Sequence, residues 1–182
     1  MRTIADHIYD IAMNSVKAGS KNVYLTIKEE SKKNEIYFSV KDDGCGIPAE
    51  KVETVFNPFY TTRDKKIRKV GLGLPLLKQN SEMTGGYAKL SSEIGKGTFT
   101  EALFKNDSVD AVEKGNIADS IHGLVVSSDE IEWHIILEKD GISEEISTLE
   151  IKDILGGVSF KNVEVIKALK GVFEELFKNM EM

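Results

Sequence analysis

Residues 40–48 (VKDDGCGIP) constrain the fold of this chain more than any other stretch. They end a strand whose apolar residues alternate over 36–40. Asp42 lies where that strand stops, so we interpret it as a carboxylate that the sheet fixes and that accepts a hydrogen bond from the amino group of a purine. Gly44 and Gly46 predict a turn through backbone conformations that other residues avoid, close to a flat ligand. An acidic hairpin loop is the alternative interpretation of this motif alone.

The first 105 residues alternate between helical and strand patterns. A helix is predicted over 3–17, where apolar residues recur at helical spacing after Thr3, a candidate cap. The remaining predicted elements are strands over 22–29 and 35–41, a short helix from 48 that ends at 57, a helix up to 83, and a hairpin of 87–92 with 98–104. This order predicts an α+β fold, a two-layer α/β sandwich with a mostly antiparallel sheet.

Charge divides the chain into two parts. Residues 1–105 contain 17 Lys and Arg against 13 Asp and Glu, whereas residues 106–182 contain 7 against 17. The first part suits a polyphosphate, and the second should repel both polyphosphates and nucleic acid. The polar segment 106–115 separates them. We therefore expect a ligand-binding domain over 1–105 and a small acidic α+β appendage over 106–182, which serves partner binding or oligomerisation.

The acidic region has its own pattern. A helix is expected over 117–126, leading into a strand, and residues 132–139 alternate as a strand that pairs back with 142–149 through Asp140-Gly141. A helix over 162–179 carries one apolar stripe, made of Val163, Ile166, Leu169, Phe173, Leu176 and Phe177. That stripe packs either on the hairpin or on another subunit, so a homodimer remains one of two expectations.

Composition points to a cytoplasmic protein. No apolar run approaches 18 residues, so no membrane span is expected. The acidic, amphipathic N-terminus lacks the apolar core of a signal peptide. The single cysteine, Cys45, excludes an internal disulfide framework and fits a reducing compartment. The cysteine and the three histidines show no metal-ligand spacing, so no zinc site is expected.

Polar residues on the first helix suggest phosphate chemistry. Asp10 and Asn14 are four residues apart and share one face. The amide oxygen of Asn14 suits one position of an octahedral Mg²⁺, and Lys17 lies one turn further on, within reach of phosphates. Asp10 is either a general base for a water near a terminal phosphate or a carboxylate that only contacts solvent and metal-bound water. The basic loop 61–73 supplies positive charge, and Thr98 is placed to support the base or a water beside the strand-end carboxylate.

Two familiar phosphate motifs are excluded. A P-loop needs Ser or Thr after Gly-Lys, whereas Lys96 is followed by Gly97. A dinucleotide fingerprint needs a third small residue where this chain has Leu76. His7, one turn before Asp10, is either a residue that orients this aspartate or an ordinary helix-face histidine.

Five motifs together resemble those of the Bergerat-fold ATP-binding superfamily, which includes gyrase B subunits, the large heat-shock chaperone, histidine kinases and MutL. DIAMNSVKAG, DDGCGIP, FNPFYTTR, VGLGLPLLK and GKGT are similar to its N box, first glycine box, F box, second glycine box and glycine-threonine box. The resemblance implies ATP and Mg²⁺ as ligands, Asn14 as metal ligand, Asp42 as adenine contact and a mobile lid at Gly71 and Gly73. The ATP contacts that it implies are Asn14, Lys17, Asp42, Gly44, Gly46, Ile47, Thr62, Arg63, Val70, Gly71, Leu72, Gly73, Leu74 and Thr98.

The resemblance is mixed within the superfamily. The F box and second glycine box are similar to histidine kinases, whereas Ala18-Gly19 is similar to MutL. Asp10 resembles the general base of the ATPases and anti-sigma-factor serine kinases, although Asp replaces the usual Glu. Since the first helix begins almost at Met1, we expect the domain that carries a phosphoacceptor histidine to be absent. The whole chain also resembles small ATP-binding proteins of the anti-sigma-factor type.

These observations together predict an ATP-binding regulatory protein of the cytoplasm. We expect it to bind ATP or ADP and to act on an unidentified regulatory protein, as a serine- or histidine-type kinase or as an anti-sigma-factor-like regulator. No nucleic-acid or membrane partner is expected. Two alternatives remain: a slow Mg-ATPase that switches conformation, and a nucleotide-sensing module that transfers no phosphate to protein.

Overall fold

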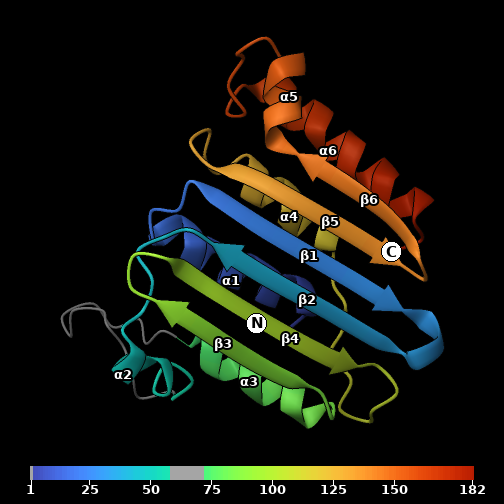
Figure 1. Ribbon diagram of the computed structural model, residues 1–182. Coiled ribbons are helices and arrows are strands. Elements are labelled where there is room, and N and C mark those ends of the chain that lie inside the picture. Colours follow the sequence, from blue (N-terminus) through green and yellow to red (C-terminus); the bar gives the residue numbers. More distant parts are fainter. Residues whose placement is uncertain (1, 58–71) are drawn as a thin grey trace.

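The protein is built around one six-stranded β-sheet, with α1, α3 and α4 on one of its faces (Figure 1). The computed structural model describes residues 2–57 and 72–182. In chain order the elements are α1 (Ile4–Lys17), β1 (Asn22–Glu30), the short 3-10 helix η1 (Ser31–Lys33), β2 (Glu35–Asp42), α2 (Ala49–Val52), α3 (Gly73–Met83), β3 (Tyr87–Glu93), β4 (Gly97–Lys105), α4 (Ile117–Val125), β5 (Glu132–Lys139), β6 (Ile142–Ser147), α5 (Thr148–Ile154) and α6 (Val163–Asn179). The strand order is β3-β4-β2-β1-β5-β6. The predicted two-layer α+β fold is confirmed.

The bounds of helix α1 are set by a capping box at its start and a glycine just after its end. Thr3 accepts a hydrogen bond from the Asp6 amide, and the Asp6 carboxylate accepts one in return from the Thr3 amide, so the two residues form a capping box. The helix ends at Ala18, and Gly19 then takes a φ of +73°. Glycine adopts that conformation without steric cost, and the chain can therefore turn directly into β1.

The acidic region continues the sheet of the first region. β5 pairs with β1 in parallel, from Asn22 opposite Glu132 to Glu29 opposite Lys139, whereas every other strand pair is antiparallel. The predicted turn at Asp140-Gly141 joins β5 to β6, and both residues have positive φ. The change of charge near residue 105 therefore falls within one continuous sheet.

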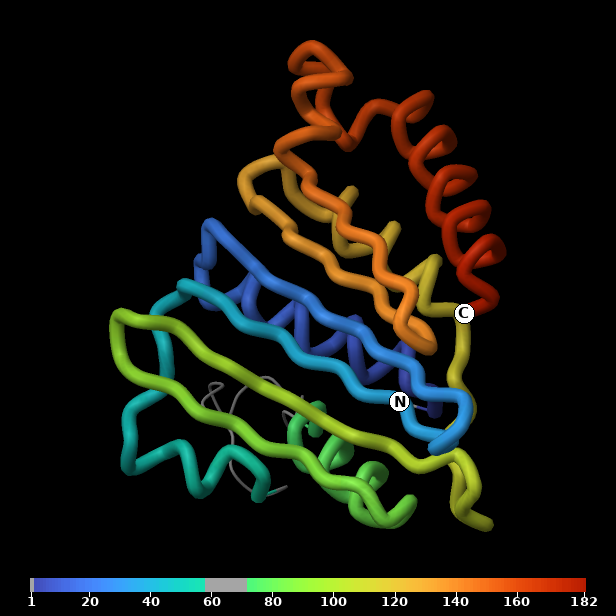
Figure 2. Tube along the Cα trace, turned by 45° about the vertical axis from the view of Figure 1, so that its right-hand side comes forward, coloured from blue at the N-terminus to red at the C-terminus, as the bar shows by residue number. Residues whose placement is uncertain are grey.

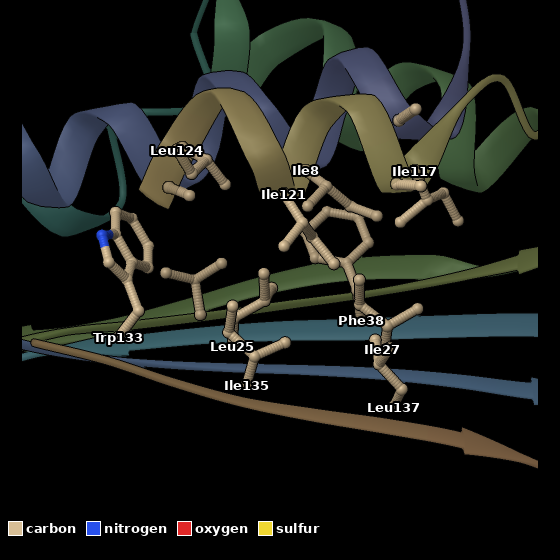
Figure 3. Close-up of a cluster of buried hydrophobic side chains, with 14 of the residues drawn as sticks. Ile8, Leu25, Ile27, Phe38, Ile117, Ile121, Leu124, Trp133, Ile135 and Leu137 are labelled. Atoms are coloured by element: carbon tan, nitrogen blue, oxygen red, sulfur yellow. The ribbon is translucent and has the colours of Figure 1, made fainter. Parts of the chain in front are cut away.

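The core lies between the sheet and the helices (Figure 3). Ile8 of α1 and Ile121 of α4 point toward the sheet, and Leu25, Phe38 and Trp133 point back toward the helices (Figure 3). All five side chains are fully buried. Because α4 and β5 supply part of this core, residues after 106 complete the apolar layer that α1 begins.

Helix α6 differs in part from its predicted stripe. It packs against α4 (Figure 2), a partner that the sequence analysis did not name. Leu169, Phe173 and Phe177 are buried as expected, but Val163 is 61% exposed and Val165 is buried in its place. The stripe therefore starts two residues later than the sequence pattern suggests. Helix α5 was not predicted, because it is only seven residues long.

In the part of the chain that the structure describes, no helix is both long and apolar enough to cross a bilayer.

Replacing Trp133 with Ala should destabilise the whole molecule. The indole is fully buried between β5 and the helix layer, so its loss should cost about 3–5 kcal/mol. We expect urea unfolding followed by circular dichroism to stay a single transition at a lower midpoint. Hydrogen exchange in β2 should accelerate in parallel. An unchanged exchange rate in β2 would show that residues 106–182 unfold as a separate unit.

The buried imidazole of His7 should make stability fall in mild acid. Burial lowers its pKa from 6.5 to about 4, so between those values the unfolded chain binds the proton more readily than the folded one. Stability contributed by neutral His7 is therefore present above pH 6.5 and lost as the pH falls toward 4, by roughly 1.4 kcal/mol per pH unit at most. His7→Leu should lose less stability than the wild type between pH 7 and pH 5 in urea titrations. Parallel pH profiles would contradict this assignment.

Candidate nucleotide-binding site

Five elements meet at one edge of the sheet: β1, β2, β4, α1 and α3. β2 runs antiparallel to both β1 and β4, so the end of β2 lies beside the start of each. Helix α1 ends immediately before β1, at this edge. Helix α3 runs antiparallel to β3, which follows it, so α3 begins at the same edge and ends at the opposite one (Figure 1). The last turn of α1, the strand-end carboxylate and the first turn of α3 are thereby brought together from distant parts of the sequence.

Asp42 is the buried centre of this edge. Its Oδ1 accepts hydrogen bonds from the Gly44 amide at 2.9 Å and the Thr98 amide at 3.3 Å. Its Oδ2 accepts one from the Ser15 hydroxyl at 2.7 Å. A carboxylate has about four acceptor positions, so one position on Oδ2 remains for a donor from outside the described chain. An amino group of an aminopurine is such a donor.

The neighbouring Asp43 has a structural role. Its Oδ1 accepts the Lys21 and Asn22 amides at 2.7 and 3.0 Å, and its Oδ2 accepts the Asn22 side-chain amide at 2.8 Å. Burial raises the pKa of Asp43, but these hydrogen bonds to the ionised form outweigh it and the pKa lies below its usual value. Asp43 therefore holds the start of β1, while Asp42 faces the site.

The two glycines of the turn serve different purposes. Gly46 has a φ of +69°, and a Cβ there would lie 2.0 Å from the Glu93 carbonyl oxygen. Gly44 does not need positive φ; a Cβ there would lie 2.7 Å from both Ala18 Cβ and Ser20 Oγ. The prediction that both glycines are required for unusual backbone angles is thus wrong for Gly44, which is needed for close packing against the end of α1.

Ser92 connects the turn to β4. Its hydroxyl accepts the Ile47 amide at 2.8 Å, donates to the Gly97 carbonyl at 2.8 Å and lies 2.9 Å from Thr98 Oγ1. The Thr98 hydroxyl thus contacts Ser92, and it is the backbone amide of Thr98 that reaches the carboxylate. Sequence reasoning missed both Ser92 and Ser15. The position of Ser15 next to Asn14 was the available signal for the latter.

The exposed face of α1 carries the other predicted residues. Asn14 and Lys17 are exposed in the last turn, and Asp10 is half-buried one turn earlier. Asp10 also lines a groove of about 450 Å³ with Tyr9 and, on α4, Asp119. His7 does not orient Asp10, because its ring points into the core toward α3, where Nε2 lies 2.9 Å from Asn80 Nδ2.

The first turn of α3 has no side-chain cap among the described residues. The Leu72 side chain makes no hydrogen bond to the Gly73 or Leu74 amides, and Pro75 has no N–H. Leu72 is exposed and Gly73 and Leu74 are half-buried. Four predicted contacts, Thr62, Arg63, Val70 and Gly71, lie outside the described residues.

A magnesium ion fits the donor chemistry of this edge. Among residues 2–57 and 72–182, no three His, Cys, Asp or Glu side chains gather closely enough to enclose a metal. Mg²⁺ commonly keeps several waters and takes only one or two protein ligands beside phosphate oxygens. The exposed Asn14 amide offers an oxygen of this kind, and the Asp10 carboxylate lies one turn away on the same helix.

Comparison with known proteins relates the first region of the chain to an ATPase family. A family model described as "Histidine kinase-, DNA gyrase B-, and HSP90-like ATPase" matches residues 2–108. The chain is 35% identical over 101 residues to sporulation kinase C of Bacillus subtilis, covering 54% of this chain and 23% of the relative. It is 32% identical over 94 residues to the signal transduction histidine-protein kinase ArlS of Staphylococcus aureus, covering 50% and 21%. It thus spans less than a quarter of either relative.

A solved structure extends the likeness in fold beyond residue 108. The crystal structure of the N-terminal domain of a DNA repair protein is similar with a TM-score of 0.59 at 14% identity, over 88% of this chain and 55% of that one. At that identity the likeness supports the fold alone, but its coverage includes much of the acidic region. The match over residues 2–108 shows that this chain belongs to the family of histidine kinase-, DNA gyrase B- and HSP90-like ATPases.

Proposed function

We propose that this protein binds Mg-ATP at the sheet edge around Asp42 and uses it to act on a regulatory protein. The buried Asp42 carboxylate is the observation that supports this most directly, since three internal donors leave one acceptor position. An adenine amino group supplies the missing donor. A guanine carbonyl at the same place would face the carboxylate with an acceptor, so the site should prefer ATP over GTP.

The triphosphate is proposed to extend from Asp42 across the last turn of α1 to the first turn of α3. Asn14 would hold the metal and Lys17 would reach a phosphate oxygen. The open amides of Gly73 and Leu74 would bind the negative charge at the helix start. A Mg²⁺ held there by Asn14 would supply positive charge to offset the negative charge that develops during phosphoryl transfer.

The partner reaction that we favour is transfer of the γ-phosphoryl group to a protein side chain. Both relatives described above are named as kinases. The bond to the ADP oxygen breaks, a bond to a serine oxygen or histidine nitrogen forms, and ADP leaves. For a serine, Asp10 would accept the hydroxyl proton. The presence of one cysteine supports a cytoplasmic location. A serine kinase that acts as an anti-sigma-factor-like regulator is one protein that would carry out this reaction.

A slow ATPase switch is the second candidate. Asp10 is only half-buried and lies one turn before Asn14, where a water could approach the terminal phosphate. In that case phosphate would be released as such, and the change between ATP and ADP would alter what the protein binds.

Ser15→Ala should weaken the binding of adenine nucleotides without unfolding the protein. Losing the 2.7 Å bond to Asp42 leaves the buried carboxylate less well oriented, and the loss should be about 1–3 kcal/mol, or roughly five- to 150-fold in affinity. Calorimetry with Mg-ADP measures it. Asp42→Asn should lose more affinity and the preference for ATP over GTP. Asn22→Ala, which alters only the Asp43 cluster, is the matched control. Retained ATP preference in Asp42→Asn would rule out the adenine assignment.

Labelled ATP separates the candidate reactions. The protein is incubated with γ-³²P-ATP and with proteins that it captures from a cell extract. A kinase should transfer the label to one of the captured proteins, whereas an ATPase should release labelled phosphate even when no partner protein is added. Asn14→Ala should abolish either activity because the metal is lost. Asp10→Asn should reduce turnover at least about 100-fold with little change in affinity if Asp10 is the base. Equal turnover in Asp10→Asn and the wild type would exclude that role.

A further inference from the structure

A single polar contact joins the two helices that carry the proposed phosphate-binding groups. His7 Nε2 on α1 lies 2.9 Å from Asn80 Nδ2 on α3. In the described part of the chain this is the one hydrogen bond between α1 and α3. Leu77, one turn before Asn80 on α3, is fully buried in the apolar core to which Ile4, Ile8 and Ile11 of α1 also belong.

The position of this contact relates it to both ends of the site. His7 is seven residues before Asn14, and Asn80 is seven residues after Gly73. Seven residues are about two turns, or roughly 10.5 Å along a helix axis. The helices run in opposite directions relative to the site edge, so the contact lies at the same depth behind the predicted metal ligand and behind the uncapped amides of α3. His7 and Asn14 also share nearly the same face of α1, because seven residues return the helix to almost the same direction.

A polar pair is an unfavourable way to fill this space. The His7 ring is fully buried, 5.9 Å from the Phe104 ring, and its Nδ1 has no hydrogen-bond partner among the described residues. A buried polar atom without a partner costs about 1–3 kcal/mol. An apolar side chain of similar volume would avoid that cost. A lone polar contact in an apolar helix interface fixes the register, that is, the position of one helix along the other.

We propose that His7 and Asn80 are positioning residues that set the register of α3 against α1, and so the distance between the uncapped amides of α3 and the metal ligand of α1. The inference rests on the proposed Mg-ATP site and concerns only its phosphate end. The adenine end depends on Asp42, Ser15 and Thr98, and among the described residues none of these three is hydrogen-bonded to the pair. The pair should therefore affect the triphosphate and leave the nucleoside unaffected.

The test compares Mg-ATP with adenosine by calorimetry in four proteins: wild type, His7→Leu, Asn80→Leu and the double variant. Leucine keeps the volume and removes the polar contact. Each single variant should bind Mg-ATP about five- to tenfold more weakly, the double variant no more weakly than either single one, and adenosine should stay within about twofold. Ser120→Ala is the control, because it removes the 3.2 Å hydrogen bond from α4 to the Ala5 carbonyl on another side of α1. It should leave the ratio of the two affinities unchanged.

The outcomes separate this inference from the function on which it rests. A wild type that binds neither ligand overturns the proposed function itself. A wild type that binds Mg-ATP, with an unchanged affinity ratio in Asn80→Leu, overturns only the positioning role. Equal weakening of both ligands likewise shows a merely structural role. Asn80 is half-buried on α3, so its variant decides the matter even where His7→Leu fails to fold.

Discussion

The hydrogen bonds around Asp42 are the interaction on which this edge of the protein depends. They join the last turn of α1, the turn after β2 and the start of β4 through one buried carboxylate. Each donor satisfies charge that would otherwise be costly to bury. The same three contacts that stabilise the turn also orient the remaining acceptor position. In the proposed function, fold stability and ligand recognition would thus depend on one group. The packing requirements at Gly44 and Gly46 follow from how closely the turn approaches its neighbours.

Local patterns predicted local structure well. The capping residue Thr3, the alternation in β1 and β2, and the Asp140-Gly141 turn all act within a few residues, and each appears where the sequence indicated. The parallel pairing of β1 with β5 joins residues more than 100 positions apart. No local sequence signal identifies the strand that pairs with β1. Alternation of apolar residues fixes which face of a strand is buried, but not which strand lies beside it. The appendage envisaged from the charge pattern is in the structure a continuation of the sheet.

The candidate site around Asp42 stays a prediction, and sequence reasoning missed the contacts that support it. Motif spacing pointed to Asp42 and the exposed face of α1, but Ser15 and Ser92 act through side-chain contacts that depend on how three elements meet. His7 shows the same limit. Its position one turn before Asp10 allowed its ring to contact that carboxylate. In the structure the ring is buried in the core, where Asn80 of α3 is its hydrogen-bond partner.

The central position of β1 has a consequence for how the protein is made. Its two neighbours in the sheet are β2, which follows it directly, and β5, which begins only at Glu132. As the chain leaves the ribosome, one edge of β1 remains uncovered until that point, and the side of α1 that later packs against α4 remains uncovered until residues 117–125 have emerged. Unpaired strand edges and apolar surfaces of this kind favour association between chains. Nascent chains should therefore be most prone to aggregation, and most dependent on chaperones, while residues 43–131 are being synthesised.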